Sequence, residues 1–187
     1  MSAKENGLKQ VLDELGSRED PKSTPIPKDQ ILSWMGSSDL DVLGVLYAHI
    51  FGSPYRERIT PPLQLDDYFE FLLTYFRRCF LENPESNWAS TRYEASWDLV
   101  KWFNSFWEDQ TVPRPRLKEI KLLLEDLYRS ADEELRTCIV NATLEHLFEN
   151  HDIADYFNDW QQDPLLKHAY GDALLWSEKG GTSPLRQ

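Results

Sequence analysis

Hydrophobic residues recur at spacings of three and four along most of the chain, the pattern of amphipathic helices. The clearest stretch comprises Leu65, Tyr68, Phe69, Leu72, Leu73, Phe76 and Phe80. Signals for β-hairpins, such as Asn-Gly or Asp-Gly between alternating hydrophobic residues, are missing from the sequence. We therefore expect an all-α fold, a compact multi-helix bundle of eight or nine helices.

The N-terminal pattern predicts a short helix over residues 3–15, with Leu8, Val11, Leu12 and Leu15 on one side. Gly16 can end this helix, and residues 17–28 form a linker rich in proline and charge. We expect residues 1–28 to be an N-terminal helix with a Pro-rich linker, followed by a helical domain over 29–178 and a frayed tail over 179–187. Residues 1–28 should then be removable without unfolding the rest.

Polar residues mark where the predicted helices begin. Asp39 can cap a helix that runs to Ile50, and Asp132 can cap one that runs to about Asn150. The second of these is apolar most of the way round, which is typical of a buried helix. Its polar residues form a narrow strip, made of Glu134, Asn141, Glu145 and Glu149. Asp152 can cap the next helix, whose apolar stripe comprises Ile153, Tyr156, Phe157 and Trp160.

Acidic residues are concentrated in residues 131–163. This window holds nine carboxylates and a single base, Arg136, so it contributes −8 of the chain's net charge of −12. Four carboxylates lie opposite the apolar stripe or just beyond it, namely Asp152, Asp155, Asp159 and Asp163. Because an ordinary exposed helix interleaves both signs of charge, we expect these four residues to bind a basic partner. The alternative interpretation is a solvated surface that keeps the protein soluble.

Composition and motifs exclude several classes of function. A sequence pI near 4.7 argues against nucleic-acid binding, which needs clustered Lys and Arg. The spacings of nucleotide-binding loops, of hydrolase nucleophiles and of zinc-binding helices do not occur in the sequence. His146 and His151 lie close to Glu145 and Glu149 but lack the Glu-x-x-His spacing of di-iron bundles. We therefore expect no catalytic residues, no bound metal and no cofactor.

Cysteine usage and hydropathy bear on the compartment. Cys79 and Cys138 both lie among apolar helical residues, so we expect buried thiols in a reducing environment. Neither a secretory signal nor an apolar run long enough to span a membrane is visible in the sequence. These observations predict a cytoplasmic protein without a membrane partner.

Residues 118–150 contain a recurring helical pattern made of Leu123, Leu124, Leu127, Tyr128, Glu133, Glu134, Leu135, Ile139, Val140, Leu144, Glu145 and Leu147. In this pattern the stretch resembles a family of small bacterial helical proteins of unknown function. Several such families look like immunity proteins, which are made beside a toxin and neutralise it. The resemblance implies a bacterial, cytoplasmic binding protein, and it carries no functional residues with it.

The most specific hypothesis is therefore a non-catalytic acidic binding protein, an immunity-type inhibitor of a basic protein partner such as a toxin. Many toxins are nucleases with cationic clefts, to which an acidic inhibitor is complementary. One alternative is a hydrolase or a metal-dependent enzyme whose site combines scattered Glu, Asp and His. Another is a scaffolding or regulatory subunit that uses the many Trp and Tyr residues as interface anchors.

Overall fold

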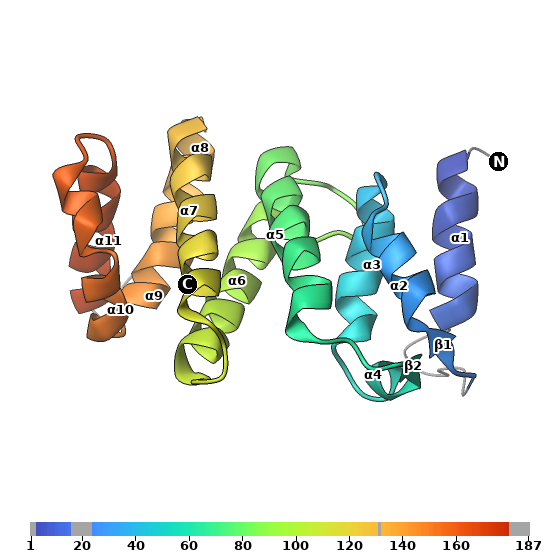
Figure 1. The fold of residues 1–187 in the computed structure, drawn as a ribbon. Coiled ribbons are helices and arrows are strands. Elements are labelled where there is room, and N and C mark those ends of the chain that lie inside the picture. The colour runs from blue at the N-terminus through green and yellow to red at the C-terminus, as the bar shows by residue number, and fades with distance from the viewer. Residues whose placement is uncertain (1–2, 16–23, 131, 180–187) are drawn as a thin grey trace. The chain divides into compact units, whose positions relative to one another are not determined.

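A computed structural model describes residues 3–15, 24–130 and 132–179 and confirms the all-α fold (Figure 1). Within these residues the helices α1 to α11 slightly exceed the eight or nine expected. The chain divides into two compact units, described here one at a time. Unit 1 comprises Met1–Cys79 and Asn83–Thr91, and unit 2 comprises Phe80–Glu82 and Arg92–Gln187. None of the described helices is both long and apolar enough to cross a membrane.

Unit 1 consists of helices and one very short pair of strands. Its elements are α1 (Ala3–Leu15), β1 (Ile26–Pro27), α2 (Lys28–Met35), α3 (Leu40–Ile50), α4 (Tyr55–Arg58), β2 (Ile59–Thr60) and most of α5 (Leu65–Glu82). The two strands run parallel, with Ile26 opposite Ile59. Asp39 caps α3 as predicted, because its carboxylate accepts a hydrogen bond from the Asp41 amide at 3.1 Å.

The first helix has a buried face. Val11 and Leu15 are almost fully buried, and α1 packs against α3. The buried guanidinium of Arg58 donates to the carbonyl oxygens of Leu15 and Thr24, each at 2.9 Å, and to that of Glu14 at 3.1 Å. Two of these carbonyls belong to the last turn of α1, where backbone acceptors lack helical partners. These contacts make α1 part of unit 1, whereas the linker led us to expect a separate segment.

Unit 2 contains the acidic window of the sequence, residues 131–163. Its elements are α6 (Arg92–Glu108), α7 (Arg114–Ser130), α8 (Glu133–Cys138), the π-helix η1 (Ile139–Leu144), α9 (Glu145–Phe148), α10 (His151–Tyr156), the 3₁₀-helix η2 (Asn158–Gln162) and α11 (Leu166–Glu178). The expected apolar stripe is confirmed, although it runs from α10 into η2, since Ile153, Phe157 and Trp160 are buried and Tyr156 is half-buried. Phe157 contacts the rings of Phe103, Phe148 and Trp160, and these aromatic side chains lie in the core of the unit.

The stretch from Asp132 to Asn150 differs from the single α-helix predicted. Asp132 does cap its start, accepting from the Leu135 amide at 2.8 Å, but residues 139–144 form a π-helix. Because a π-helix bonds residue i to i+5 and not i+4, the residues after it are rotated relative to a regular helix. Glu145, expected on the polar strip, is consequently 3% exposed.

The start of α10 is also shifted from the prediction. Asn150 is the N-cap, and its side chain accepts a hydrogen bond from the Asp152 amide at 3.0 Å. Asp152 therefore lies in the first turn of α10, where a carboxylate is favoured by the helix dipole.

Candidate functional site

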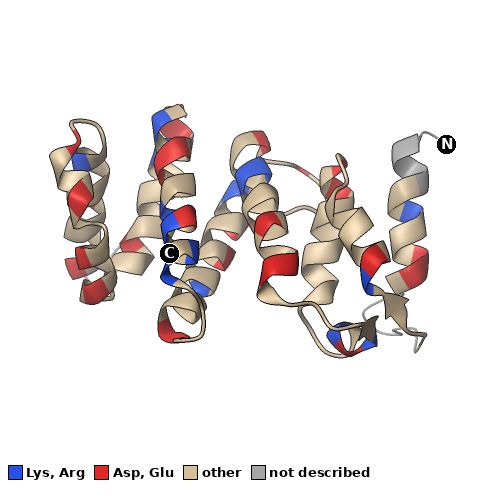
Figure 2. Ribbon diagram, viewed as in Figure 1, with Lys and Arg blue, Asp and Glu red and all other residues tan. Residues whose placement is uncertain are grey.

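The four predicted aspartates lie on α10, on η2 and at the residue after η2, on the part of unit 2 that faces α7. Figure 2 shows Lys and Arg interspersed with Asp and Glu on α7, and mostly Asp and Glu along the segment from α10 to α11. Asp152 and Asp155 are exposed, and neither forms an ion pair with a residue in the described part of the chain. Asp159 and Asp163 do form ion pairs, so the four carboxylates are not equivalent.

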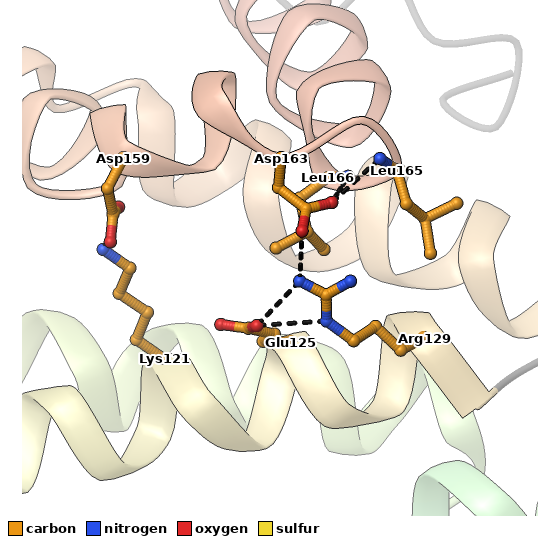
Figure 3. Close-up of polar contacts among 7 residues, drawn as sticks. All are labelled: Lys121, Glu125, Arg129, Asp159, Asp163, Leu165 and Leu166. Atoms are coloured by element: carbon orange, nitrogen blue, oxygen red, sulfur yellow. Dashed lines mark hydrogen bonds and ion pairs between the residues drawn. The ribbon is translucent and has the colours of Figure 1, made fainter.

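Asp159 is held by Lys121 of α7. The Lys121 ammonium donates to the Asp159 carboxylate (Figure 3). It also donates to the carbonyl oxygen of Tyr156, at 2.8 Å. It also lies 4.8 Å and 5.1 Å from the ring centroids of Tyr156 and Phe157. Lys121 is only 8% exposed. A buried ammonium needs such partners, and a cation at the last carbonyls of α10 also complements the helix dipole.

Asp163 connects α7 to the start of α11. One carboxylate oxygen accepts from the amides of Leu165 and Leu166, at 2.8 Å and 3.0 Å. The other accepts from Arg129 at 2.5 Å, and Arg129 also binds Glu125 at 2.9 Å (Figure 3). The hydrogen bond from Arg129, followed by those from the two amides, lowers the pKa of Asp163 to about 2. Asp163 therefore stays ionised across the ordinary range of pH.

The bases that balance these acids come from distant positions in the sequence. Lys121 and Arg129 lie 38 and 34 residues before the carboxylates that they bind. In α6, the buried Arg92 approaches Glu134 at 3.3 Å and Asp132 at 4.0 Å. A charge count over residues 131–163 cannot include these bases. One signal was present, because Lys121 follows Leu117 and precedes Leu124 on the apolar stripe of α7, where a lysine needs a buried partner.

A groove of about 400 Å³ lies beside the aspartates, between α7 and the α10–η2 segment. We call it the acidic groove. It is lined by Lys118, Lys121, Leu122, Glu125, Asp155, Tyr156 and Asp159. Leu122 is 45% exposed, so an apolar surface lies next to the unpaired carboxylate of Asp155. A basic side chain could place its aliphatic stem on Leu122 and its charged end at Asp155.

Other candidate chemistry receives little support from the described residues. Among them no three His, Cys, Asp or Glu side chains gather in a way that could hold a metal ion. His146 lies 3.0 Å from Glu149 on the surface of its own helix. Burial raises the pKa of the Cys138 thiol to about 11, so the thiol stays protonated and unreactive. Its sulfur lies 3.2 Å from the Ser96 hydroxyl oxygen.

Comparison of the chain with models of protein families, with curated proteins and with solved structures found no match. The likeness of residues 118–150 to helical immunity-type families therefore stays a prediction.

Proposed function

We propose that this protein is a non-catalytic acidic binding protein, and most specifically an immunity-type inhibitor that covers a basic surface of a protein partner such as a toxin. Asp152, Asp155, Asp159 and Asp163 form the proposed binding region together with the acidic groove. The observation that carries the proposal is the pair of exposed carboxylates on α10, Asp152 and Asp155, that have no counter-ion in the described part of the chain.

The four carboxylates have different roles in this proposal. Lys121 and Arg129 offset the charges of Asp159 and Asp163, so these two contribute less to the field that a partner meets. Asp152 and Asp155 keep their full charge and steer the encounter, which raises the association rate more than the affinity. Leu122 and Tyr156 supply the apolar contact area that slows dissociation once the partner is bound.

The proposal can be tested by co-expression with a toxin-like protein encoded beside this gene. We expect this protein to relieve growth inhibition by that neighbour and to form a complex with it in purified form. Asp152→Asn combined with Asp155→Asn should lower the association rate at low salt, and the wild-type rate should fall steeply as salt is raised.

A matched control removes the same charge elsewhere. Glu85 and Glu108 are exposed and form no ion pair within the described residues. Glu85→Gln combined with Glu108→Gln should leave the association rate close to that of the wild type. Equal rates for the two double variants would assign Asp152 and Asp155 to an ordinary solvated surface. An absence of binding and of protection would reject the inhibitor function itself.

A scaffolding role is the second candidate, because two large aromatic side chains are exposed. Trp97 of α6 is 51% exposed and Trp88 of unit 1 is 41% exposed. Tryptophan is a frequent anchor at protein interfaces. Under the scaffolding hypothesis, binding of the partner protein should be weakened by Trp97→Ala or by Trp88→Ala. Under the inhibitor hypothesis, both variants should bind the partner protein like the wild type.

A further inference from the structure

A second groove lies on unit 2, beside the π-helix, and it differs from the acidic groove in its chemistry. Its volume is about 290 Å³, near the lower end of the range for small-ligand sites. Residues of α7, α8, the π-helix and α11 line it, among them Tyr128, Glu133, Arg136, Asn141, Asp172 and Trp176. We call it the π-helix groove. π-Helical turns occur frequently at functional sites.

Arg136 is the only base in the window 131–163, and it is fixed in this groove. Its Nε donates to the Tyr128 carbonyl oxygen at 2.9 Å, and its guanidinium carbon lies 5.5 Å from the Tyr128 ring centroid. Despite the many acids nearby in sequence, Arg136 forms no ion pair with any described carboxylate. The terminal nitrogens of the guanidinium thus remain available as a planar fork, the geometry that suits a carboxylate.

Two carboxylates also line this groove, but neither forms an ion pair with Arg136. Glu133 and Asp172 are both exposed, and neither has an ion-pair partner in the described part of the molecule. The pKa of Tyr128 indicates that two of these charged groups lie near its phenol. Burial is the main cause that raises the pKa of its phenol, while Arg136 lowers that pKa and Asp172 raises it. Opposite charges therefore lie around one small cavity, too far apart to pair with each other.

We propose that the π-helix groove binds a free α-amino acid in its zwitterionic form. The carboxylate of the ligand would accept from the guanidinium fork of Arg136, and its ammonium would donate to Asp172 and Glu133. A molecule that carries an ammonium and a carboxylate on the same carbon atom can bind a cationic and an anionic wall at once. Trp176, half-buried, offers its ring to the ligand's side chain, and the Asn141 side chain supplies a further polar contact. This site is independent of the proposed inhibitor function.

The test is a titration of the isotope-labelled full-length protein, followed through the indole N–H signal of Trp176 in NMR spectra. The probes are L-phenylalanine, L-leucine and L-glutamine. Two analogues of the first probe each lack one charge, 3-phenylpropionate without the ammonium and phenethylamine without the carboxylate. We expect saturable shifts with at least one amino acid. If L-phenylalanine is bound, each analogue should bind about tenfold more weakly or worse, the loss expected for one charge-assisted contact.

Variants separate recognition from folding. Asp172→Asn and Glu133→Gln change exposed side chains, so we expect an unchanged melting temperature and at least a fivefold weaker binding of the amino acid in the double variant. Arg136→Lys keeps the charge but loses the fork, and it should weaken binding as well. The proposal is overturned if none of the three amino acids shifts the Trp176 signal, or if 3-phenylpropionate or phenethylamine binds as tightly as L-phenylalanine. It is also overturned if the Asp172 and Glu133 double variant binds like the wild type.

Discussion

Gly44 of α3 lies so close to Trp88 that a Cβ atom on the glycine would be 2.3 Å from the tryptophan carbonyl oxygen. The obstacle is backbone, which cannot turn aside as a flexible side chain can. Gly44→Ala should therefore force α3 and the segment at Trp88 apart and lower the free energy of unfolding by about 1–3 kcal/mol or more. Chemical denaturation of the variant measures this loss.

Gly171→Ala is the matched control for that substitution. Gly171 lies within α11, and a Cβ at this position would meet nothing within 4 Å. Alanine favours a helix over glycine by roughly 0.5–1 kcal/mol, so this variant should be as stable as the wild type or more so. A Gly44→Ala protein as stable as Gly171→Ala would contradict the close approach.

The contact between Lys121 and Asp159 should be energetically asymmetric. Lys121→Met leaves the Tyr156 carbonyl without its donor and should cost about 1–3 kcal/mol. Asp159→Asn changes a mostly exposed carboxylate, whose side chain is 68% exposed, and should cost less than about 1 kcal/mol. Denaturation of both single variants and the double variant measures the coupling. Equal losses for the two single variants would show that the ion pair, and not the burial of Lys121, dominates.

Acid titration should reveal the role of Asp163. Its pKa is lowered from 3.8 to about 2, chiefly by Arg129, so the folded protein holds the ionised form more strongly than the unfolded chain does. The resulting stabilisation is present above the unfolded value and is lost as pH falls from about 4 towards 2. Asp163→Asn should remove this part of the acid-dependent loss, measured as the melting temperature against pH. Parallel curves for variant and wild type between these values would contradict it.

Substitution of the aspartates should separate into two classes. Asp152→Asn with Asp155→Asn should change the melting temperature little, because the relief of neighbouring like charges is offset by the lost interaction of Asp152 with the helix dipole. Asp159→Asn with Asp163→Asn should lower it, because Lys121 and Arg129 lose their charged partners. Phe157→Ala or Trp160→Ala should cost roughly 3–5 kcal/mol, since both side chains are buried. The same change for both Asp pairs would show that the ion pairs to α7 contribute nothing measurable.

Truncation tests whether the N-terminal helix is separable. A chain that begins at residue 29 loses the buried side chains of Val11, Leu15 and Ile26 and the three carbonyl partners of Arg58. We expect a lower melting temperature, partly because the buried guanidinium is left without acceptors. Arg58→Met in the truncated chain should recover some of the loss. A truncated chain that melts like the full protein would support the separable segment expected from the linker.

Local chemistry made much of the fold predictable. The helix over residues 3–15, the caps at Asp39 and Asp132 and the buried stripe of α10 and η2 each depend on neighbouring residues, and all are present in the structure. The two-residue strands were not predicted, because the pairing of Ile26 with Ile59 joins distant segments that each resemble loops. The partners of Asp159 and Asp163 were missed for the same reason. Helical periodicity places an aspartate on a face but does not identify the helix opposite.

The π-helix predicts how this part of the chain responds to a change in its length. It contains one residue more than an α-helical turn of the same reach, so it behaves as an insertion that the fold has absorbed. Deleting a single residue between 139 and 144 would therefore give a regular helix and keep the residues after it on their present faces. Forcing all of residues 139–144 into a regular α-helix would instead turn everything after them by about 100°. Glu145 would then move out of the interior, and Leu147 and Phe148 would lose their places in the core. The length of this segment, more than the identity of any one side chain in it, thus sets which face of the following helix is apolar.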